Sequence, residues 1–511
     1  MMARPWGQVS VSVYETARLL GSAPWLEGHD RRRAWLLAAQ HADGSWGGPD
    51  GYAVVPTLSA VEALLASGGT AEESAARRGL AWLADRLPRL HRLPDMPAID
   101  LTVPSLVERI AARAHRLPLP RGLTTRRLDR VRQAAAGGAA LPDKLLHAWE
   151  ALGPAVPPPP AAARQLRTGG LVGASPAATA AVLAGSRAGS HANGRADSHA
   201  GNHAGSHAES TAAAWHLRQI AGRFGGPVPV AVPITVFERA WVLSWLSRCA
   251  VPYTPVPEMV ADLHAAIGPA GTPAGPGLPA DADTTAVALH ALALLGLPHP
   301  PDSLLAFDTG EHIATWPGED GASVTVNAHA LDALTAWLRH TPGDARRFGP
   351  VAARLTAWLL ERQHPDGWWE DRWHASPLYA TMSAALALAE DSPHLEQDTR
   401  VRIREALRRA HDWIMAAQRP DGTWGRWDGT AEESAYAVLT LLLPPADPSR
   451  VRAARRAAPA LTAGADRADH PPLWHDKDLY SPLAVVRAAI TAACHRLELA
   501  VPAARGQGGP G

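Results

Sequence analysis

Hydrophobic residues recur three and four positions apart through most of this chain, and that spacing is typical of helices that bury one face. Segments rich in Pro and Gly separate these stretches, and the alternating pattern of half-buried strands is sparse. The clearest helical segments are 54–66, 285–295, 328–339, 376–389 and 432–443. The pattern therefore predicts an all-α protein built from many helices.

A second pattern, Gln-x-x-Asp-Gly-x-Trp, occurs three times, at residues 40–46, 363–369 and 418–424. The Gly permits a tight turn, and the Trp offers a large flat surface for packing. The Gln amide can bond the backbone groups that are left unpaired at helix ends. We therefore expect each repeat to tie the ends of outer helices together in a barrel of helices.

Other segments indicate connections between these helices. Residues 154–160 contain four consecutive prolines and predict a stiff connector. Residues 186–210 consist mainly of Gly, Ala, Ser, Asn and spaced His, so we expect a disordered surface insert, with metal binding as the weaker alternative. A Gly/Pro loop at 268–279 leads directly to a short acidic stretch.

The composition of the chain argues against several classes of function. The 511 residues suffice for two or three domains. The 49 basic and 49 acidic residues give a net charge of zero, which argues against a nucleic-acid-binding protein. Two cysteines cannot form a disulfide framework, and no Cys/His spacing resembles a zinc site. With no signal peptide at the start and no run of 18 apolar residues, we expect a cytoplasmic protein without a membrane span.

Lysine is almost absent from the chain. Only Lys144 and Lys477 are lysines among the 49 basic residues, and all others are arginines. Because a compact ammonium differs in shape from a planar guanidinium, we expect these two residues where the shape of the cation matters. Chance retention in an Arg-biased genome is the alternative.

The acidic stretch runs from Asp281 to Thr285 and precedes a predicted helix. Asp and Thr are both common at helix N-termini, so a capping role is the simplest interpretation. The alternative is catalytic. When one of two nearby aspartates is ionised, the other holds its proton more tightly, and a protonated Asp in a dry pocket can act as a general acid.

Motifs spread along nearly the whole chain carry a resemblance to a known family. They lie at residues 94–106, 141–147, 175–180, 233–241, 323–331, 373–379, 429–436 and 473–482. In their order and spacing the chain resembles the class II terpene cyclases, specifically the bacterial diterpene cyclases related to copalyl diphosphate synthases. The resemblance implies that the acidic stretch protonates a carbon–carbon double bond.

The family pattern at this stretch is Asp-x-Asp-Asp, and the chain departs from it at Thr284. By resemblance, Asp283 is the proton donor, Asp281 orients and polarises it, and Asn327 contacts the donor and orients its proton. His329 is a further candidate partner of the site, or an ordinary core histidine. Since the donor is present, we interpret Thr284 as a subfamily variant of an active enzyme.

The resemblance also implies the architecture: two double-helical α-barrel domains, called β and γ, with the active site between them. We expect the β domain to comprise residues 1–24 and 226–511, and to carry the acidic stretch. The γ domain is then inserted as residues 25–225, which include the insert at 186–210.

The implied substrate is geranylgeranyl diphosphate, cyclised to a bicyclic labdane-type diphosphate, with (ent-)copalyl diphosphate as the expected product. The chain contains no Asp-Asp-x-x-Asp motif of the kind that ionises diphosphates, so the product should keep its diphosphate and pass to a downstream class I diterpene synthase. Mg²⁺ is the implied cofactor. Its ligands are unassigned, although Glu432 and Glu433 are acidic candidates that could equally be helix-start residues.

Cations and aromatic rings complete the expected site. We expect Lys144, Lys477 and Arg372 to neutralise the diphosphate. Aromatic rings stabilise cations by roughly 0.5–2 kcal/mol each, and the candidates to line the pocket are Trp316, Trp369, Trp373 and Tyr379.

Two alternatives remain open at this point. With the same fold, the enzyme would make drimenyl diphosphate from farnesyl diphosphate, or a rearranged halimadienyl- or clerodane-type diphosphate. In the other class of function, the chain is a non-catalytic helical-barrel scaffold that binds a partner or a prenylated ligand.

Overall fold

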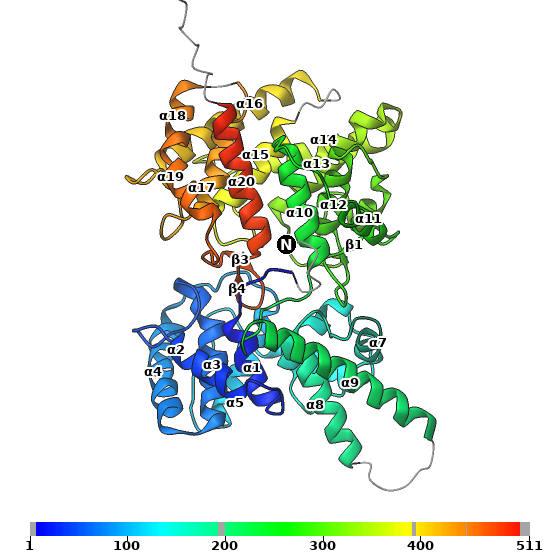
Figure 1. The fold of residues 1–511 in the computed structure, drawn as a ribbon, viewed down its shortest axis with the longest axis vertical. Helices are drawn as coiled ribbons and strands as arrows, with labels where there is room; N and C mark the ends of the chain where they lie inside the picture. The colour runs from blue at the N-terminus through cyan, green and yellow to red at the C-terminus, as the bar shows by residue number, and fades with distance from the viewer. Residues whose placement is uncertain (1–6, 193–199, 391–394, 446, 501–511) are drawn as a thin grey trace, which may run out of the picture.

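The computed structural model describes residues 7–192, 200–390, 395–445 and 447–500. It is mostly helical, as the apolar spacing predicts, and its helices form two bodies stacked along the long axis (Figure 1). We call helices α1–α9 the N-terminal barrel and helices α10–α20 the C-terminal barrel.

The N-terminal barrel contains α1 (Val13–Ser22), α2 (His29–Ala38), α3 (Val54–Ser67), α4 (Thr70–Arg86), α5 (Ile99–Ala111), α6 (Arg126–Ala136), α7 (Pro160–Gly169), α8 (Pro176–Ala192) and α9 (Ala200–Arg223), with the 3-10 helices η1 (Asp50–Ala53), η2 (Leu87–Arg89) and η3 (Asp143–Leu152). Its inner ring closes because α1 packs against α3, α3 against α5, α5 against η3, η3 against α8, and α8 against α1.

The C-terminal barrel contains α10 (Thr235–Arg248), α11 (Pro257–Ala266), α12 (Ala282–Leu294), α13 (Val324–His340), α14 (Ala345–Glu361), α15 (Pro377–Ala389), α16 (Gln397–Ala416), α17 (Ala431–Leu441), α18 (Pro448–Arg456), α19 (Ala458–Ala465) and α20 (Leu483–Leu499), with the 3-10 helices η4 (Pro301–Phe307) and η5 (Pro342–Asp344). Its inner ring runs through α10, α12, α13, α15, α17 and α20, and α20 packs back against α10. Both rings confirm the expected helical barrels.

Short strands occur at two places. β1 (Thr272–Pro273) pairs antiparallel with β2 (Ala280–Asp281), and β3 (Trp474–His475) pairs antiparallel with β4 (Leu479–Tyr480). The first pair leads into α12. The second lies where the two barrels meet (Figure 1), and its Leu479 shares a small apolar cluster with Tyr52 and Met96 of the N-terminal barrel.

The three repeats act as expected. The Gln amide of each donates to the carbonyl of its own Gly and to a carbonyl of the next outer helix; for Gln363 these are Gly367 and Ala406, both at 2.8 Å. Each Gly has a positive φ, 104° at Gly367, which favours Gly over other residues. Each Trp is fully buried and donates its indole N–H back to the preceding helix. The repeats therefore join consecutive outer helices.

The first helix, α1, closes the ring of the N-terminal barrel, because its apolar face packs with α3. The domain boundaries, with residues 1–24 assigned to the β domain, stay a prediction. The segment 186–210, which we expected to be disordered, is helical up to Ala192 and again from Ala200. Alanine, abundant there, is the strongest helix former. Residues 193–199 lie outside the described part.

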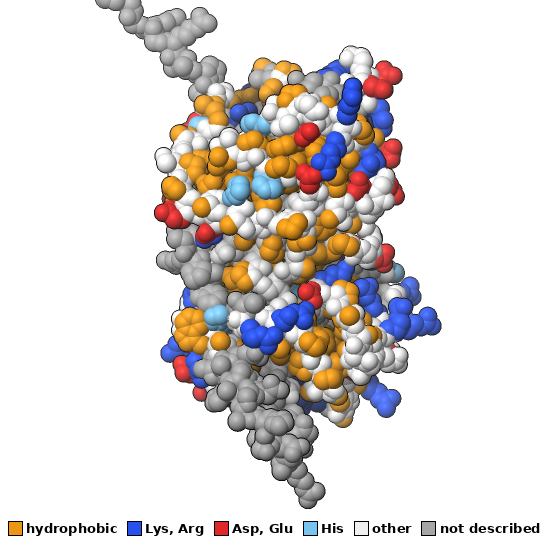
Figure 2. Space-filling model, turned by 90° about the vertical axis from the view of Figure 1, so that its right-hand side faces the viewer, with side chains coloured by type: hydrophobic (Ala, Val, Ile, Leu, Met, Phe, Trp, Pro, Cys, Tyr) orange, Lys and Arg blue, Asp and Glu red, His pale blue; other side chains and the backbone are white. Residues whose placement is uncertain are grey.

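The surface carries charges of both signs. On the face in Figure 2, acidic side chains lie next to basic ones along one edge of the C-terminal barrel, and apolar side chains lie between charged ones over both barrels. Within the described residues, none of the helices is both long enough and apolar enough to cross a lipid bilayer.

Candidate active site

Asp281 caps the helix that carries the acidic stretch. It is the N-cap of α12, and its Oδ1 accepts the backbone N–H of Thr284 at 2.6 Å while its Oδ2 accepts the Thr284 hydroxyl at 2.9 Å. Burial raises the pKa of Asp281 to about 7, even though the Thr284 donors act in the opposite direction. The capping interpretation thus holds for Asp281, and Thr284 is the residue that its carboxyl holds.

Asp283 lies in the first turn of the same helix and has a different neighbour. Its Oδ1 is 2.6 Å from Nδ1 of His329 on α13, and its side chain remains 16% exposed. No hydrogen bond to Oδ2 is present among the described residues. Burial alone would lower the pKa of His329, but the Asp283 carboxylate raises it. One carboxyl oxygen is therefore anchored, and the other is available to carry a proton toward a ligand.

Asn327 does not fill the role we expected. Its Oδ1 accepts the N–H of Ile313 at 2.8 Å, and its Nδ2 donates to the carbonyls of Ile313 and Ser323. The amide is therefore fully engaged in fixing the loop before α13. The partner of Asp283 in this structure is His329, two residues further on and one of the candidates from the sequence.

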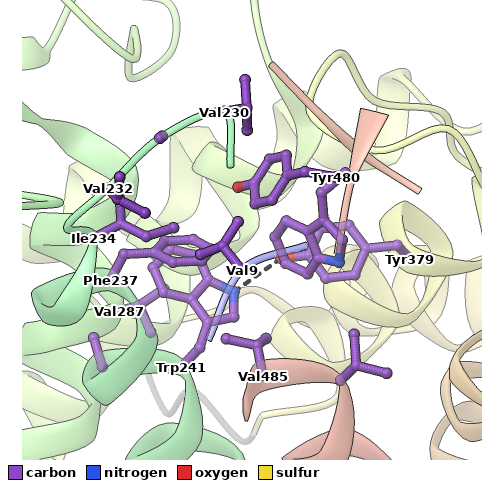
Figure 3. Packing of buried hydrophobic residues seen from close by; sticks show 14 of the residues in the cluster. Val9, Val230, Val232, Ile234, Phe237, Trp241, Val287, Tyr379, Tyr480 and Val485 are labelled. Carbon is purple, nitrogen blue, oxygen red and sulfur yellow. Dashed lines mark hydrogen bonds between the residues drawn. The ribbon is translucent and has the colours of Figure 1, made fainter. Parts of the chain in front are cut away.

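Aromatic side chains surround this pair. The indole N–H of Trp241 donates to the Tyr379 hydroxyl at 3.0 Å, and the His329 ring lies 5.4 Å from the Trp241 ring and 6.4 Å from the Tyr379 ring. Figure 3 shows Tyr379 and Tyr480 opposite Trp241 and Phe237, with valine side chains between them. Tyr379 thus lies near the acid, as expected.

Further aromatic residues of this cluster were not among the candidates. They are Phe237, Trp241, His374, Tyr436, Trp474 and Tyr480. All lie within the motifs that carried the resemblance, which was the signal that could have identified them.

His329 also borders a pocket inside the C-terminal barrel. The pocket lies within the ring of inner helices, and its polar lining includes Ser244, His290, Asp332 and Ser383. The Ser244 hydroxyl lies 3.0 Å from Nδ1 of His290. His329, which contacts the candidate proton donor Asp283, therefore also borders a pocket with polar side chains.

The prediction that Trp369 lines the pocket is wrong. It is the Trp of the second repeat, fully buried, and its indole N–H donates to the Leu359 carbonyl at 2.8 Å. Its role is to join the helices around it. The repeat pattern already contained this explanation.

Four of the remaining candidates come together between the barrels. The Trp316 and Trp373 rings meet edge to face at 5.4 Å, Lys144 lies over the Trp316 ring at 5.6 Å, and Arg372 lies over the Trp373 ring. The indole nitrogens of both Trp residues are buried and have no hydrogen-bond partners in the described ranges of the chain. The cluster thus offers two cations and two unpartnered N–H donors.

Acidic side chains flank the same cluster. Arg372 forms ion pairs with Glu319 at 2.7 Å and with Asp95 at 2.9 Å. Lys144 has no carboxylate within ion-pair distance among the described residues, and desolvation lowers its pKa although Glu319 acts against this. Lys144 is therefore the cation with the most capacity left for an anionic ligand.

Lys477 does not lie at a ligand site in this structure. Its ammonium is buried in the tip of the β3–β4 hairpin, where it pairs with Glu15 and with Glu150 at 2.9 Å and donates to the Ser175 hydroxyl and the His147 carbonyl. Burial alone would lower its pKa, but Glu15 and Glu150 raise it. Lys477 pins the hairpin into the N-terminal barrel, which corrects our expectation of a diphosphate contact.

Glu432 and Glu433 start α17. Thr430 is the N-cap: its hydroxyl accepts the Glu433 N–H and donates to Glu433 Oε2. Both glutamates are buried. Among the described residues, no group of three or more His, Cys, Asp or Glu side chains is arranged to hold a metal ion.

Comparisons with known proteins find relatives over nearly the whole chain. The model of the squalene-hopene cyclase C-terminal domain matches residues 319–449. The chain is 43% identical to an ent-copalyl diphosphate synthase from Streptomyces sp. (strain KO-3988) over 525 residues, covering 99% of this chain and 96% of that protein. It is 42% identical to a labda-7,13-dienyl diphosphate synthase from Streptomyces clavuligerus, covering 98% of this chain and 91% of that protein.

A solved structure shares the whole architecture. The ent-copalyl diphosphate synthase from Streptomyces platensis is 39% identical and superposes with a TM-score of 0.84, covering 97% of each chain.

Proposed function

The chain belongs to the class II diterpene cyclases, and we propose that it converts geranylgeranyl diphosphate to a bicyclic labdane-type diphosphate, with (ent-)copalyl diphosphate as the expected product. The observation that carries the proposal is the Asp283–His329 pair, in which His329 anchors one carboxyl oxygen and the other has no hydrogen-bond partner among the described residues. Family membership rules out the alternative of a non-catalytic scaffold.

The reaction starts at Asp283. The π electrons of the terminal alkene take the proton from the carboxyl, which leaves a carboxylate on Asp283 and a tertiary cation on the substrate. His329 stabilises that carboxylate through its contact with Oδ1, and Asp281 holds the first turn of α12 in place. Two further alkenes then capture the cation and close two rings, and loss of a C–H proton ends the reaction.

The surroundings suit a migrating cation. Tyr379, Trp241 and the other rings of the aromatic cluster present π faces without mobile charge, and each ring contact stabilises a cation by roughly 0.5–2 kcal/mol. A dry wall also protects the cation from capture by water.

The diphosphate is expected at the Lys144–Arg372 cluster. Both cations lie over Trp rings between the barrels. Mg²⁺ commonly binds one or two carboxylates together with substrate phosphates, and Asp95 and Glu319 fit that donor set. When bound, the ion would supply charge neutralisation for the diphosphate. The product keeps its diphosphate and passes to a class I diterpene synthase; that partner and the cytoplasmic location stay predictions.

The test is a product analysis. Purified protein is incubated with Mg²⁺ and either geranylgeranyl or farnesyl diphosphate, and the products are dephosphorylated and identified by mass spectrometry and NMR. We expect a bicyclic C20 alcohol. A bicyclic C15 alcohol from farnesyl diphosphate alone would favour the drimenyl alternative, a rearranged C20 skeleton would favour the halimadienyl or clerodane alternative, and linear alcohols from both would contradict the proposal.

A further inference from the structure

Glu432 is a buried carboxylate with an unusual set of partners. It lies in the first turn of α17, and its side chain is fully buried. Carboxylates are rarely buried unless a cation pairs with them. Among the described residues, no Lys or Arg pairs with Glu432. Its negative charge is instead held by neutral donors and one histidine, so an ion pair does not explain the residue.

These partners all meet one oxygen. Oε1 accepts the Trp474 indole N–H at 2.8 Å and the Tyr436 hydroxyl at 2.8 Å, and Nε2 of His374 lies 3.3 Å away. Oε2 is buried and has no hydrogen-bond partner within the part of the chain that the structure describes. A buried polar atom without a partner calls for an explanation, and here it is the basic oxygen of a carboxylate.

The neighbouring Glu433 shows that helix capping does not explain Glu432. Glu433 Oε1 accepts the Arg426 N–H at 2.7 Å, and its Oε2 accepts the Thr430 hydroxyl at 2.9 Å. Both of its oxygens are engaged in starting the helix. Glu432 contributes no hydrogen bond to that cap, so its side chain is available for another role.

Glu432 faces the same aromatic cluster as the acid. Its partners His374, Tyr436 and Trp474 lie with ring centroids 4.8, 5.2 and 4.8 Å from Tyr379. Tyr379 in turn contacts the His329 ring. These rings therefore connect the partners of Glu432 with His329, which holds Asp283.

We propose that the Glu432 carboxylate is the base that ends the cyclisation. Oε2 takes a proton from a carbon next to the final cationic centre, the electrons of that C–H bond become the new carbon–carbon double bond, and Glu432 becomes a carboxylic acid. Asp283 gives one proton and Glu432 receives one, so the reaction remains an isomerisation. This inference rests on the proposed function.

The direct test replaces the base without changing its shape. In Glu432→Gln, the amide oxygen can still accept the three donors at the Oε1 position, but the other end no longer accepts a proton. We expect the bicyclic alkene of the parent to fall at least tenfold as a fraction of products, replaced by alcohols from water capture or by rearranged skeletons. Glu432→Asp keeps a displaced carboxylate and should restore part of the parent product.

Glu433→Gln is the matched control, because it makes the same change on the adjacent buried residue. It should lower the melting temperature and leave the product distribution unchanged. Circular dichroism confirms folding of each variant, and Glu432→Ala replaces Glu432→Gln if the latter does not fold.

Two results would overturn the proposal. One is a folded variant without a carboxylate at position 432 that keeps the parent product distribution. The other is a folded Glu432 variant that yields no cyclised product, since loss of a terminal base redirects a cation but does not prevent its formation. Failure of the parent itself to cyclise would instead contradict the proposed function, so the two failures are distinguishable.

Discussion

The two lysines of the chain lie in opposite surroundings, although their rarity singles out both. Lys477 is buried and held by two carboxylates, a hydroxyl and a carbonyl. Lys144 is half-buried over an indole ring and has no carboxylate within ion-pair distance among the described residues. A fully satisfied cation builds the fold, whereas a cation with unused capacity is the one that can meet a ligand. The same contrast separates Glu433 from Glu432.

The largest expected effect is on stability, at Lys477. Lys477→Met leaves Glu15 and Glu150 buried without their cation, which should cost about 3–5 kcal/mol of unfolding free energy. Urea unfolding followed by circular dichroism measures this cost.

Lys144→Met is the control for that experiment and should change the unfolding free energy by less than about 1 kcal/mol. The triple variant Lys477→Met with Glu15→Gln and Glu150→Gln should recover part of the loss, because it removes the unpaired charges. If Lys477→Met and Lys144→Met lowered the unfolding free energy equally, the contrast between the two lysines would be wrong.

A second expected effect is the pH dependence that Asp281 gives to stability. Its pKa is about 7 in the folded protein and near 3.8 in the unfolded chain, so between these values the folded state binds more protons and stability falls as pH rises. The slope from this group is at most about 1.4 kcal/mol per pH unit.

Asp281→Asn isolates that contribution, since Asn still caps a helix. Urea unfolding between pH 4 and pH 8 should show a smaller decline for the variant than for the parent. If the unfolding free energies of the parent and Asp281→Asn changed identically with pH, Asp281 would not be the source of the pH dependence.

The smallest effect concerns substrate binding by Lys144. Lys144→Ala should raise KM for geranylgeranyl diphosphate by roughly tenfold with a smaller change in kcat, because one charge-assisted contact to the diphosphate is lost. The effect should shrink at high salt, and Lys144→Arg should retain most of the binding. An unchanged KM at low salt would show that Lys144 does not contact the diphosphate.

The fold was largely predictable because it follows from local patterns. Apolar spacing gave the helices, and the repeats around Trp46, Trp369 and Trp424 predicted how outer helices are joined. The position of the acid was predictable too, because Asp283 lies within a few residues of its cap. Contacts between residues from distant segments of the chain were not predictable. His329 was one of two neighbouring candidates, and only the packing of α13 on α12 places it, and not Asn327, against Asp283.

Charge pairing was the least predictable feature. The partners of Lys477 lie 302–462 positions away in the sequence, so no local pattern predicts them. The same holds for the hydrogen bond between Trp241 and Tyr379 and for the ring contact between Tyr379 and Trp474.

The most direct test of the central claim compares the two aspartates of the acidic stretch. Product formation from geranylgeranyl diphosphate is measured for the parent, Asp283→Asn and Asp281→Asn, with folding checked by circular dichroism. If Asp283 is the proton donor, its variant loses bicyclic product by about 10²–10⁴-fold, while Asp281→Asn, which retains the helix cap, keeps measurable activity. A folded Asp283→Asn variant that cyclises at the parent rate would contradict the account.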